Sequence, residues 1–340
     1  MNSLSPTEAA YYRKMENQRV ECRLCPHHCI LPNGKYGICR VRKNLEGTLL
    51  AENYGKLSAI HLDPVEKKPL YHFYPGMSIL SVGSIGCNLQ CSFCQNCEIS
   101  QSGMSGFPAI RSYSPGEIVS MATGADKNIG IAYTYNEPVV FYEFMLETAI
   151  LAGRQNLKNV IVTNGFISPG PLQQLLGHID AFNVDLKSFD DHFYKAQTHS
   201  ALDPVKQSLY AIRKSGRHLE ITNLVIPGLN DDDKIFLEMI KWIAGELGPH
   251  TILHLSRYFP RHRMSLDSTP AATLDRLWNI ASGYLKYVYV GNVAGGKGQD
   301  THCAGCHTRV IERRGYQTDA SGLDADGRCI SCGELVAVYS

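Results

Sequence analysis

The stretch ILSVGSIGCNLQCSFCQNC, residues 79–97, joins a short apolar run to a loop that carries four cysteines. The run is mostly apolar and does not alternate with charged residues, which is typical of a strand buried in a parallel sheet. The cysteines follow at once, spaced C-x3-C-x2-C and then two residues further on, at Cys87, Cys91, Cys94 and Cys97. Three thiolates at this spacing indicate a metal or iron–sulfur site with one coordination position left open. A zinc site with Cys97 as fourth ligand is the alternative that the spacing leaves.

Six similar apolar runs follow along the chain. They occupy residues 130–135, 159–164, 181–186, 219–226, 252–256 and 287–293. Helical patterns separate them, among them residues 137–155, 203–216 and 231–248. This alternation of strands and helices predicts an α/β fold, a partial or closed (β/α) TIM-like barrel.

Local signals mark the ends of the predicted helices. Pro138 stands in the first turn of the helix expected over 137–155. In the next helix, we expect Asp203 to be the N-cap and Gly216 the stop. The helix within 231–248 opens with three aspartates, where the helix dipole favours negative charge.

Polar residues follow almost every predicted strand. One such residue is most often a cap or part of a turn, but a cluster at nearly all strand ends indicates a site. Barrel active sites lie at the carboxyl ends of the parallel strands. The candidate binding residues are Asn136, Glu137, Thr163, Asn164, Asp185, Lys187, Asn223 and His254.

Composition limits the class of protein. The net charge is +1 over 340 residues, which gives no electrostatic indication of nucleic-acid binding. We find neither a secretory signal nor an apolar run long enough to span a membrane, and expect a cytoplasmic protein. In that compartment, twelve cysteines are more typical of metal sites than of disulfides.

Two further groups of four cysteines flank the predicted barrel. The C-terminal group has paired C-x2-C knuckles and predicts a structural zinc site held by Cys303, Cys306, Cys329 and Cys332. The N-terminal group fits zinc or an auxiliary 4Fe-4S cluster, with Cys22, Cys25, Cys29 and Cys39 as ligands. We favour zinc there, because the sequence shows no electron path. His27 and His28 are further candidate ligands, which we expect to be exposed.

These groups suggest three parts. We expect an N-terminal Cys-rich segment over residues 1–75, a barrel over 76–298 and a zinc-ribbon-like segment over 299–340.

The C-x3-C-x2-C motif, with aromatic Phe93 before its last cysteine, resembles the radical S-adenosylmethionine (SAM) superfamily. The segments YTYNEP (133–138), VTNGF (162–166), NVDLKSF (183–189) and LVIPGLND (224–231) resemble its branch of pyruvate formate-lyase activating enzymes. The segment CRLCPHHCILPNGKYGICRVR (22–42) and the C-terminal cysteines are similar to those of AmmeMemoRadiSam radical enzymes. Cys97 departs from the pattern, since a large aromatic residue is expected there, and we interpret it as a bystander.

The resemblance implies a mechanism. Cys87, Cys91 and Cys94 would hold a 4Fe-4S cluster whose open iron is chelated by the amino and carboxylate groups of SAM. Reductive cleavage of SAM would give methionine and a 5′-deoxyadenosyl radical that abstracts hydrogen from a substrate. A reductase or a flavodoxin-like protein would donate the electron, and companion proteins of the AmmeMemoRadiSam system are candidate partners.

The resemblance also suggests roles for the strand-end residues. Asn136 and Glu137 would meet the methionine ammonium group, and Thr163 and Asn164 would lie near the ribose and carboxylate. Lys187 of the D-x-K element would pair with the carboxylate. Each residue has a structural alternative, such as a helix cap at Asn136 or a buried ion pair between Asp185 and Lys187. Asn223 and His254 have the weakest support, because a histidine on an apolar strand is often a core residue.

Two classes of function follow. The first is a radical enzyme, which either activates a partner protein or acts directly on a small molecule or peptide. The second is a non-enzymatic zinc-binding adaptor with three structural sites of four cysteines each. The strand-end polar residues favour the first class, because an adaptor has no need of them.

Overall fold

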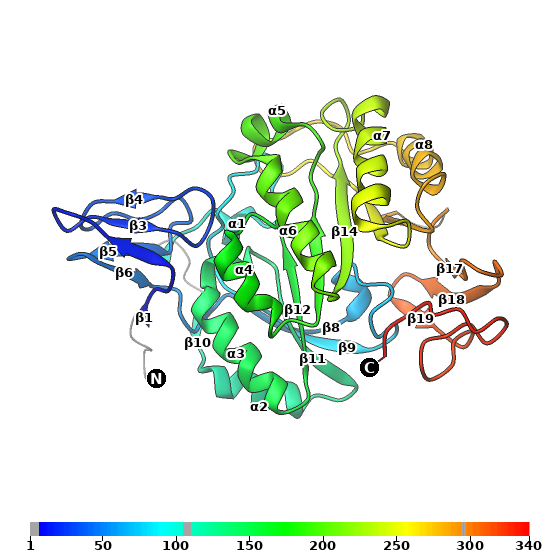
Figure 1. Ribbon diagram of the computed structural model, residues 1–340, viewed down its shortest axis with the longest axis horizontal. Helices are drawn as coiled ribbons and strands as arrows, with labels where there is room; N and C mark the ends of the chain where they lie inside the picture. The colour runs from blue at the N-terminus through cyan, green and yellow to red at the C-terminus, as the bar shows by residue number, and fades with distance from the viewer. Residues whose placement is uncertain (1–6, 105–109, 294, 296, 340) are drawn as a thin grey trace.

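An eight-stranded sheet forms the centre of the computed structural model, which describes residues 7–104, 110–293, 295 and 297–339 (Figure 1). The strand order is β16-β15-β14-β13-β12-β11-β9-β8. The strands are β8 (Ala59–Pro64), β9 (Ser78–Gly83), β11 (Asn128–Tyr133), β12 (Lys158–Thr163), β13 (Ala181–Asp185), β14 (His218–Val225), β15 (Ile252–Arg257) and β16 (Tyr287–Gly291). All neighbours pair in parallel except β8 and β9, which are antiparallel.

The α/β prediction is confirmed, and the barrel is partial. Each of the seven apolar runs identified in the sequence forms a strand whose ends lie within two residues of those predicted. Within the described residues no pairing joins β16 to β8, so the sheet curls without closing. The sequence pattern missed β8, the edge strand, which lies within residues 1–75 although it pairs with β9.

Helices cover the outer face of this sheet (Figure 1). The longer ones are α2 (Pro115–Thr123), α3 (Tyr142–Arg154), α4 (Pro169–Leu176), α6 (Leu202–Lys214), α7 (Asp233–Trp242) and α8 (Ala271–Ser282). Pro138 opens a 3₁₀ turn, η3 (Pro138–Phe141), that leads directly into α3. The prediction of Asp203 as an N-cap is wrong. The helix starts one residue before it, at Leu202, and the Asp203 carboxylate accepts a hydrogen bond from Gln207 instead.

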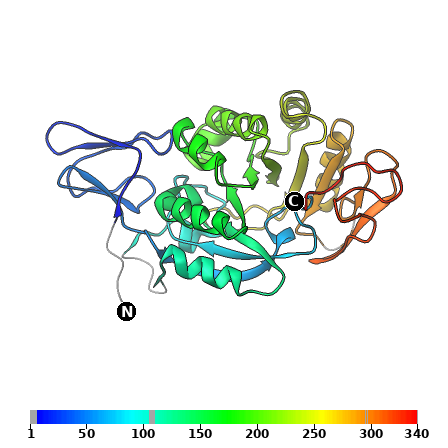
Figure 2. The same cartoon turned by 60° about the horizontal axis from the view of Figure 1, so that its bottom comes forward.

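Small sheets of the N-terminal and C-terminal segments lie on opposite sides of the barrel (Figure 2). At the N-terminal end, β1 (Thr7–Glu8), β6 (Thr48–Ala51) and β5 (Arg42–Leu45) form one sheet, and β2 (Tyr12–Lys14), β3 (Val20–Cys22) and β4 (Ile30–Leu31) form another. At the C-terminal end, β17 (Thr301–His302), β18 (Arg309–Arg314) and β19 (Gln317–Asp319) form a third. Two short strands, β7 (Lys56–Leu57) and β10 (Arg111–Ser112), also pair.

Glu220 closes the amino end of the barrel. Its buried carboxylate accepts hydrogen bonds from the backbone N–H groups of Tyr71 and His72, at 2.9 and 2.8 Å. It also contacts His218 Nε2 at 2.8 Å and His254 Nε2 at 2.6 Å. A buried carboxylate needs such partners, because leaving it unpaired away from water is costly. The network therefore fixes the segment before β9 against the sheet, opposite the end where the cysteine loop lies.

Candidate active site

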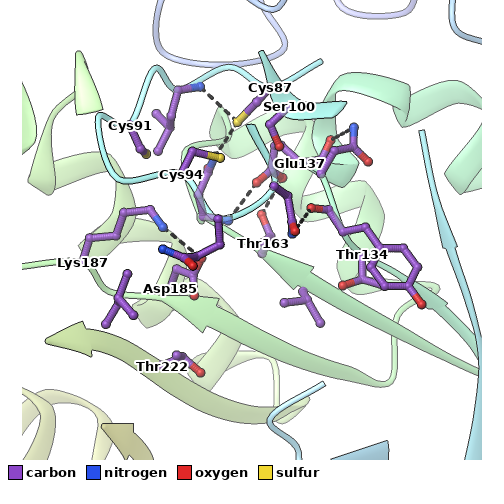
Figure 3. A pocket seen from close by; sticks show the side chains of 18 of the residues that line it. Cys87, Cys91, Cys94, Ser100, Thr134, Glu137, Thr163, Asp185, Lys187 and Thr222 are labelled. Carbon is purple, nitrogen blue, oxygen red and sulfur yellow. Dashed lines mark hydrogen bonds and ion pairs between the residues drawn. The ribbon is translucent and has the colours of Figure 1, made fainter. Parts of the chain in front are cut away.

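A cavity of about 480 Å³ lies at the carboxyl ends of the parallel strands. This volume is within the usual range for a small-molecule site. Cysteines from the loop after β9 line it, together with Glu137 from the segment after β11 and Asp185 and Lys187 at the end of β13 (Figure 3). The predicted residues that line it are Cys87, Cys91, Phe93, Cys94, Asn136, Glu137, Thr163, Asn164, Asp185 and Lys187.

The cysteine loop presents its sulfurs to this cavity. Gly86, with φ +84°, turns the chain directly before Cys87. The Cys87 sulfur accepts a hydrogen bond from the N–H of Leu89 at 3.3 Å and contacts Asn164 Nδ2 at 3.8 Å. Hydrogen bonds to the sulfurs are a feature by which proteins tune iron–sulfur clusters. Three thiol side chains around one cavity, with adjacent N–H donors, fit a cluster held by three cysteines.

Cys97 lies outside this lining. It is the first residue of the short helix α1 (Cys97–Ser100), and it is not among the residues that line the cavity.

Glu137 is a buried carboxylate at the edge of the cavity. Its oxygens accept hydrogen bonds from Val139 N at 3.1 Å, Thr163 Oγ1 at 2.7 Å and Asn164 N at 2.8 Å. Burial raises the pKa of Glu137 to about 7, although these hydrogen bonds act in the opposite direction. The contact with Val139 also caps η3, so the side chain has a structural role as well as a place in the site.

Lys187 and Asp185 form an ion pair of 2.9 Å that also lines the cavity. They leave the end of β13 two residues apart and so point to the same side. The pKa of Lys187 is raised: burial alone would lower it, but the nearby Asp185 carboxylate outweighs that effect. The ammonium also lies 5.9 Å from the ring of Phe93, next to the cysteines. The cavity therefore carries both a cation and a carboxylate near the cysteine loop.

Asn136 and Asn164 hold the loops in place. Asn136 accepts from Ser84 N at 2.9 Å and donates to Gly86 O at 2.9 Å, which ties the end of β11 to the cysteine loop. Asn164 donates to Asn88 Oδ1 at 2.9 Å. Both side-chain amides thus line the cavity and are hydrogen-bonded to the loops around it.

Two predicted residues do not reach the cavity. Asn223 points to the other side of β14, where it donates to Leu186 O at 2.7 Å. His254 shares a face with the cavity residue Ser256 but lies two residues deeper, where it pairs with Glu220. Neither residue lines the cavity, so the structure lends their assignment to cofactor binding no support.

Several lining residues were not predicted as binding residues. They are Lys67, Lys68, Leu89, Gln95, Asn96, Ser100, Thr134, Tyr135, Val162, Thr222, Leu224, Ser256 and Asn292. Thr222, Ser256 and Asn292 follow the strand-end pattern and were detectable in the sequence. Lys68 was not detectable, because it comes after β8, which the sequence pattern missed. Its side chain is held at the cavity by an ion pair with Asp63 at 2.7 Å and by the Tyr135 ring, whose centre is 4.7 Å away.

The two outer cysteine groups differ in geometry. In the C-terminal group the Cys303 and Cys332 sulfurs are 3.5 Å apart, and those of Cys306 and Cys329 are 3.6 Å apart. All four C-terminal sulfurs lie within 4.8 Å of one another, which fits a single metal ion in a zinc ribbon. The N-terminal cysteines lie around a second, smaller cavity.

A protein-family match includes the cysteine loop. The family described as the radical SAM superfamily matches residues 82–240, from β9 into α7. The chain belongs to the radical SAM superfamily. Membership implies a 4Fe-4S cluster and SAM, and the three cysteines that line the cavity of this radical SAM enzyme fit such a cluster.

One relative of this radical SAM enzyme matches nearly its whole length, and another about half of it. An uncharacterized protein of Methanocaldococcus jannaschii is 40% identical over 334 residues, covering 97% of this chain and 99% of its own. The pyruvate formate-lyase-activating enzyme of Clostridium pasteurianum is 24% identical over 191 residues, covering 54% of this chain and 78% of its own. The similarity to activating enzymes places the chain in the activase-like branch.

Solved structures agree in fold. A radical SAM methyltransferase from Sphaerobacter thermophilus is 18% identical, with a TM-score of 0.50, over 67% of this chain and 71% of its own. SuiB of Streptococcus suis, bound to SAM, is 13% identical, with a TM-score of 0.50, over 64% of this chain and 52% of its own. No helix in the described part of this radical SAM enzyme has the length and apolar character to cross a bilayer.

Proposed function

We propose that this enzyme reductively cleaves SAM at a 4Fe-4S cluster held by Cys87, Cys91 and Cys94. The observation that supports the proposal most strongly is the shared cavity: three cysteines, a buried carboxylate and a lysine line one space of about 480 Å³. When bound, the cluster supplies the electron that breaks the sulfonium C–S bond, and the resulting 5′-deoxyadenosyl radical abstracts hydrogen from a substrate.

The charged residues of the cavity would orient SAM. Glu137 would accept from its ammonium group and Lys187 would pair with its carboxylate, which are charge-assisted contacts. Thr163 and Asn164 hold the Glu137 carboxylate in place through their hydrogen bonds at 2.7 and 2.8 Å. The curled sheet below the site, closed by Glu220 and its partners, would keep water from the reacting centre.

Anaerobic reconstitution tests this function. Cluster-loaded protein, SAM and a one-electron reductant should yield methionine and 5′-deoxyadenosine, which mass spectrometry detects. Cys91→Ala should abolish cleavage because it removes a cluster ligand. Cys97→Ala should retain it, because Cys97 does not line the cavity. Loss of the cluster in Cys97→Ala would contradict the ligand assignment.

We further propose that hydrogen abstraction occurs on a partner protein, as the activase-like relatives suggest. The electron would come from a reductase or flavodoxin-like protein. Deuterium transfer into 5′-deoxyadenosine from a deuterated glycyl-radical enzyme encoded next to this chain would support activation. Transfer only from a small molecule or peptide would support direct action, with companion proteins of the AmmeMemoRadiSam system as candidate suppliers. A protein that carries three zinc ions and no iron would instead support the adaptor function.

A further inference from the structure

The four N-terminal cysteines line a second cavity, next to the cysteine loop of the active site. Its other lining residues are mostly apolar, and they include Val139 and Val140 of η3 and Asn88 of the cysteine loop. The cavity has a volume of about 20 Å³, more than the roughly 10–15 Å³ that one water needs. The four cysteines therefore line one common space.

The separation of the sulfurs is wider than zinc requires. A zinc ion with four thiolates at about 2.3 Å brings the sulfurs to roughly 3.8 Å from one another. In the described part of the chain, only the C-terminal cysteines form a group of three or more potential ligands within 4.8 Å. The N-terminal sulfurs therefore resemble those of Cys87, Cys91 and Cys94, which also stand further apart. In a 4Fe-4S cluster each thiolate binds a different iron, so a wider separation is needed.

Arg42 supplies a second observation. Its side chain is 1% exposed, lines this cavity and pairs with Glu143. Its Nε–H has no hydrogen-bond partner among the described residues. A buried donor left without a partner is costly, and a buried guanidinium also needs negative charge. A group carrying four thiolates and sulfide would provide both the acceptor and the charge.

The two cysteine groups are in direct contact through the loop at Gly86. A Cβ placed on Gly86 would lie 2.5 Å from the carbonyl oxygen of Cys39. On the other side, the His27 ring contacts Asn88 O at 2.7 Å, and Asn88 follows Cys87 directly. His27 is half-buried between the two groups, which corrects the expectation that it is exposed. These contacts place the two cysteine groups next to each other, which the sequence did not show.

We propose that Cys22, Cys25, Cys29 and Cys39 hold an auxiliary 4Fe-4S cluster beside the cluster of the active site. This replaces zinc as the favoured ligand of the N-terminal group. The cluster would accept one electron from the external flavodoxin-like donor and pass one electron to the active-site cluster. Each centre gains and then loses a single negative charge, so no further reactant is needed. The existence of the site is independent of SAM cleavage, whereas its role as a relay rests on the proposed function.

Metal analysis of the full-length protein tests the site directly. After anaerobic purification, we expect about eight iron atoms and about eight sulfides per chain, since two 4Fe-4S clusters are present. We also expect about one zinc, at the C-terminal knuckles. About four irons with about two zinc ions would overturn the proposal, because zinc would then occupy the N-terminal group. This measurement needs no variant and is independent of catalysis.

Variants locate the second cluster. Cys25→Ser combined with Cys29→Ser should lower the iron content to about four per chain. Cys97→Ser is the matched control, since it removes a nearby thiol outside both groups and should retain about eight irons. Retention of all iron in the double variant would overturn the assignment. If the double variant fails to fold, Mössbauer spectra of wild type and of the combined Cys87→Ala, Cys91→Ala and Cys94→Ala variant decide. The latter should keep about four irons in one cluster, and loss of all cluster signal would contradict the proposal.

The relay has its own readout. In the reduced wild-type protein, two neighbouring paramagnetic clusters should broaden each other's electron paramagnetic resonance signals. The Cys25→Ser, Cys29→Ser variant should show the narrower signal of an isolated cluster and accept electrons from the flavodoxin-like donor at least tenfold more slowly. An unchanged reduction rate would reject the relay but not the site. An absence of SAM cleavage in fully loaded wild type would reject the proposed function instead.

Discussion

Glu137 and Lys187 are the residues on which cofactor recognition depends, and each already has a partner inside the protein. Glu137, not Asn136 as considered from the sequence, caps η3, and Lys187 pairs with Asp185, so both side chains have a structural role. Their place in the cavity beside the cysteines is what supports an additional role. A side chain with two roles should affect both stability and affinity, and the two effects can be measured separately.

We expect Glu137→Gln and Lys187→Met each to weaken SAM binding about tenfold to a hundredfold. A charge-assisted hydrogen bond contributes roughly 1.5–3 kcal/mol, and about 1.4 kcal/mol corresponds to one decade of affinity. The iron content should stay unchanged, because neither residue is a ligand. Calorimetric titration of SAM into each cluster-loaded variant measures the effect.

Lys195→Met is the control for the lysine. Lys195 also pairs with an aspartate, Asp191, at 2.6 Å, but it is exposed and outside the cavity. This variant should bind SAM as wild type does. Wild-type affinity in both Glu137→Gln and Lys187→Met, with lowered thermal stability, would leave them only their structural roles.

The sequence predicted which side chains line the cavity where they directly follow a strand. It did not predict how far down each strand the cavity reaches. Asp185 and Lys187 leave the end of β13, so their spacing alone placed them on one side. His254 is on the same face as Ser256, and only the depth of the cavity floor separates them. Glu220 and the backbone at Tyr71 fill the space below the cavity, next to His254. The sequence around residue 254 gives no sign of these contacts.

At the scale of elements, Gly130 is decisive for the sheet beneath the site. It lies within β11, where the pairing with β9 shifts between Asn128 and Ile131. The Asn128 side chain accepts from Leu80 N at 2.9 Å and so replaces a ladder hydrogen bond. A Cβ at Gly130 would stand 1.8 Å from the carbonyl oxygen of Lys158 in β12. The strand pair can approach this closely only because the residue has no side chain.

Gly130→Ala should therefore destabilise the fold strongly. The clash is with backbone, so β11 and β12 must separate, and we expect a loss of about 3 kcal/mol or more in the free energy of unfolding. Gly153→Ala in helix α3 is the control, because a Cβ there meets nothing within 4 Å. It should stabilise the protein by up to about 1 kcal/mol. Denaturant unfolding measures both, and equal effects of the two variants would contradict this account.

The C-terminal knuckles form a separate element with its own metal. We propose that it is zinc, given the short distances between the sulfurs. Cys329→Ser should remove about one zinc per chain and lower the melting temperature, because binding of a structural metal contributes to folding free energy. The iron content should not change. Iron and sulfide bound by these four cysteines would show that this site too is a cluster.

The strands of the barrel were predictable because each is a run of buried apolar residues. The edge strand β8 was not, because its outer side is in solvent, with Leu62 47% exposed. It also carries the polar residues His61 and Asp63, which break the apolar pattern. Edge strands of this kind depend on their neighbour for pairing, and a single sequence contains little sign of it.

At the scale of the whole molecule, a chain of hydrogen bonds joins the C-terminal segment to the barrel. Arg313 donates to Thr301 Oγ1 at 2.8 Å, and Thr301 and Tyr289 share a contact of 2.7 Å. Tyr289 contacts His72 Nε2 at 2.6 Å, and His72 Nδ1 contacts Val336 O at 2.6 Å. Because a carbonyl only accepts, Nδ1 carries the proton of the neutral ring and Nε2 accepts from the Tyr289 hydroxyl. Protonation of His72 would require the Tyr289 hydroxyl to accept from Nε2 and to donate to Thr301 instead.

The contribution of His72 to stability should consequently fall as the pH falls from about 6.5 to about 4, whereas the raised pKa of Glu137, about 7, acts in the opposite direction down to about pH 4.5. Burial lowers the pKa of His72 from 6.5 to about 4, so over this window the unfolded chain binds a proton that the folded chain does not. The difference corresponds to about 3 kcal/mol of unfolding free energy, present near neutral pH and lost towards pH 4. Hydrogen bonds and ion pairs hold the pKa of Glu220 well below its usual value despite burial, so its contribution is lost only at lower pH. Denaturant unfolding at a series of pH values measures the slope. His72→Phe should be less stable at pH 7 because Tyr289 and Val336 lose their partner, but this stability deficit relative to wild type should shrink between pH 6.5 and 4. The same slope in both proteins would show that another group is responsible.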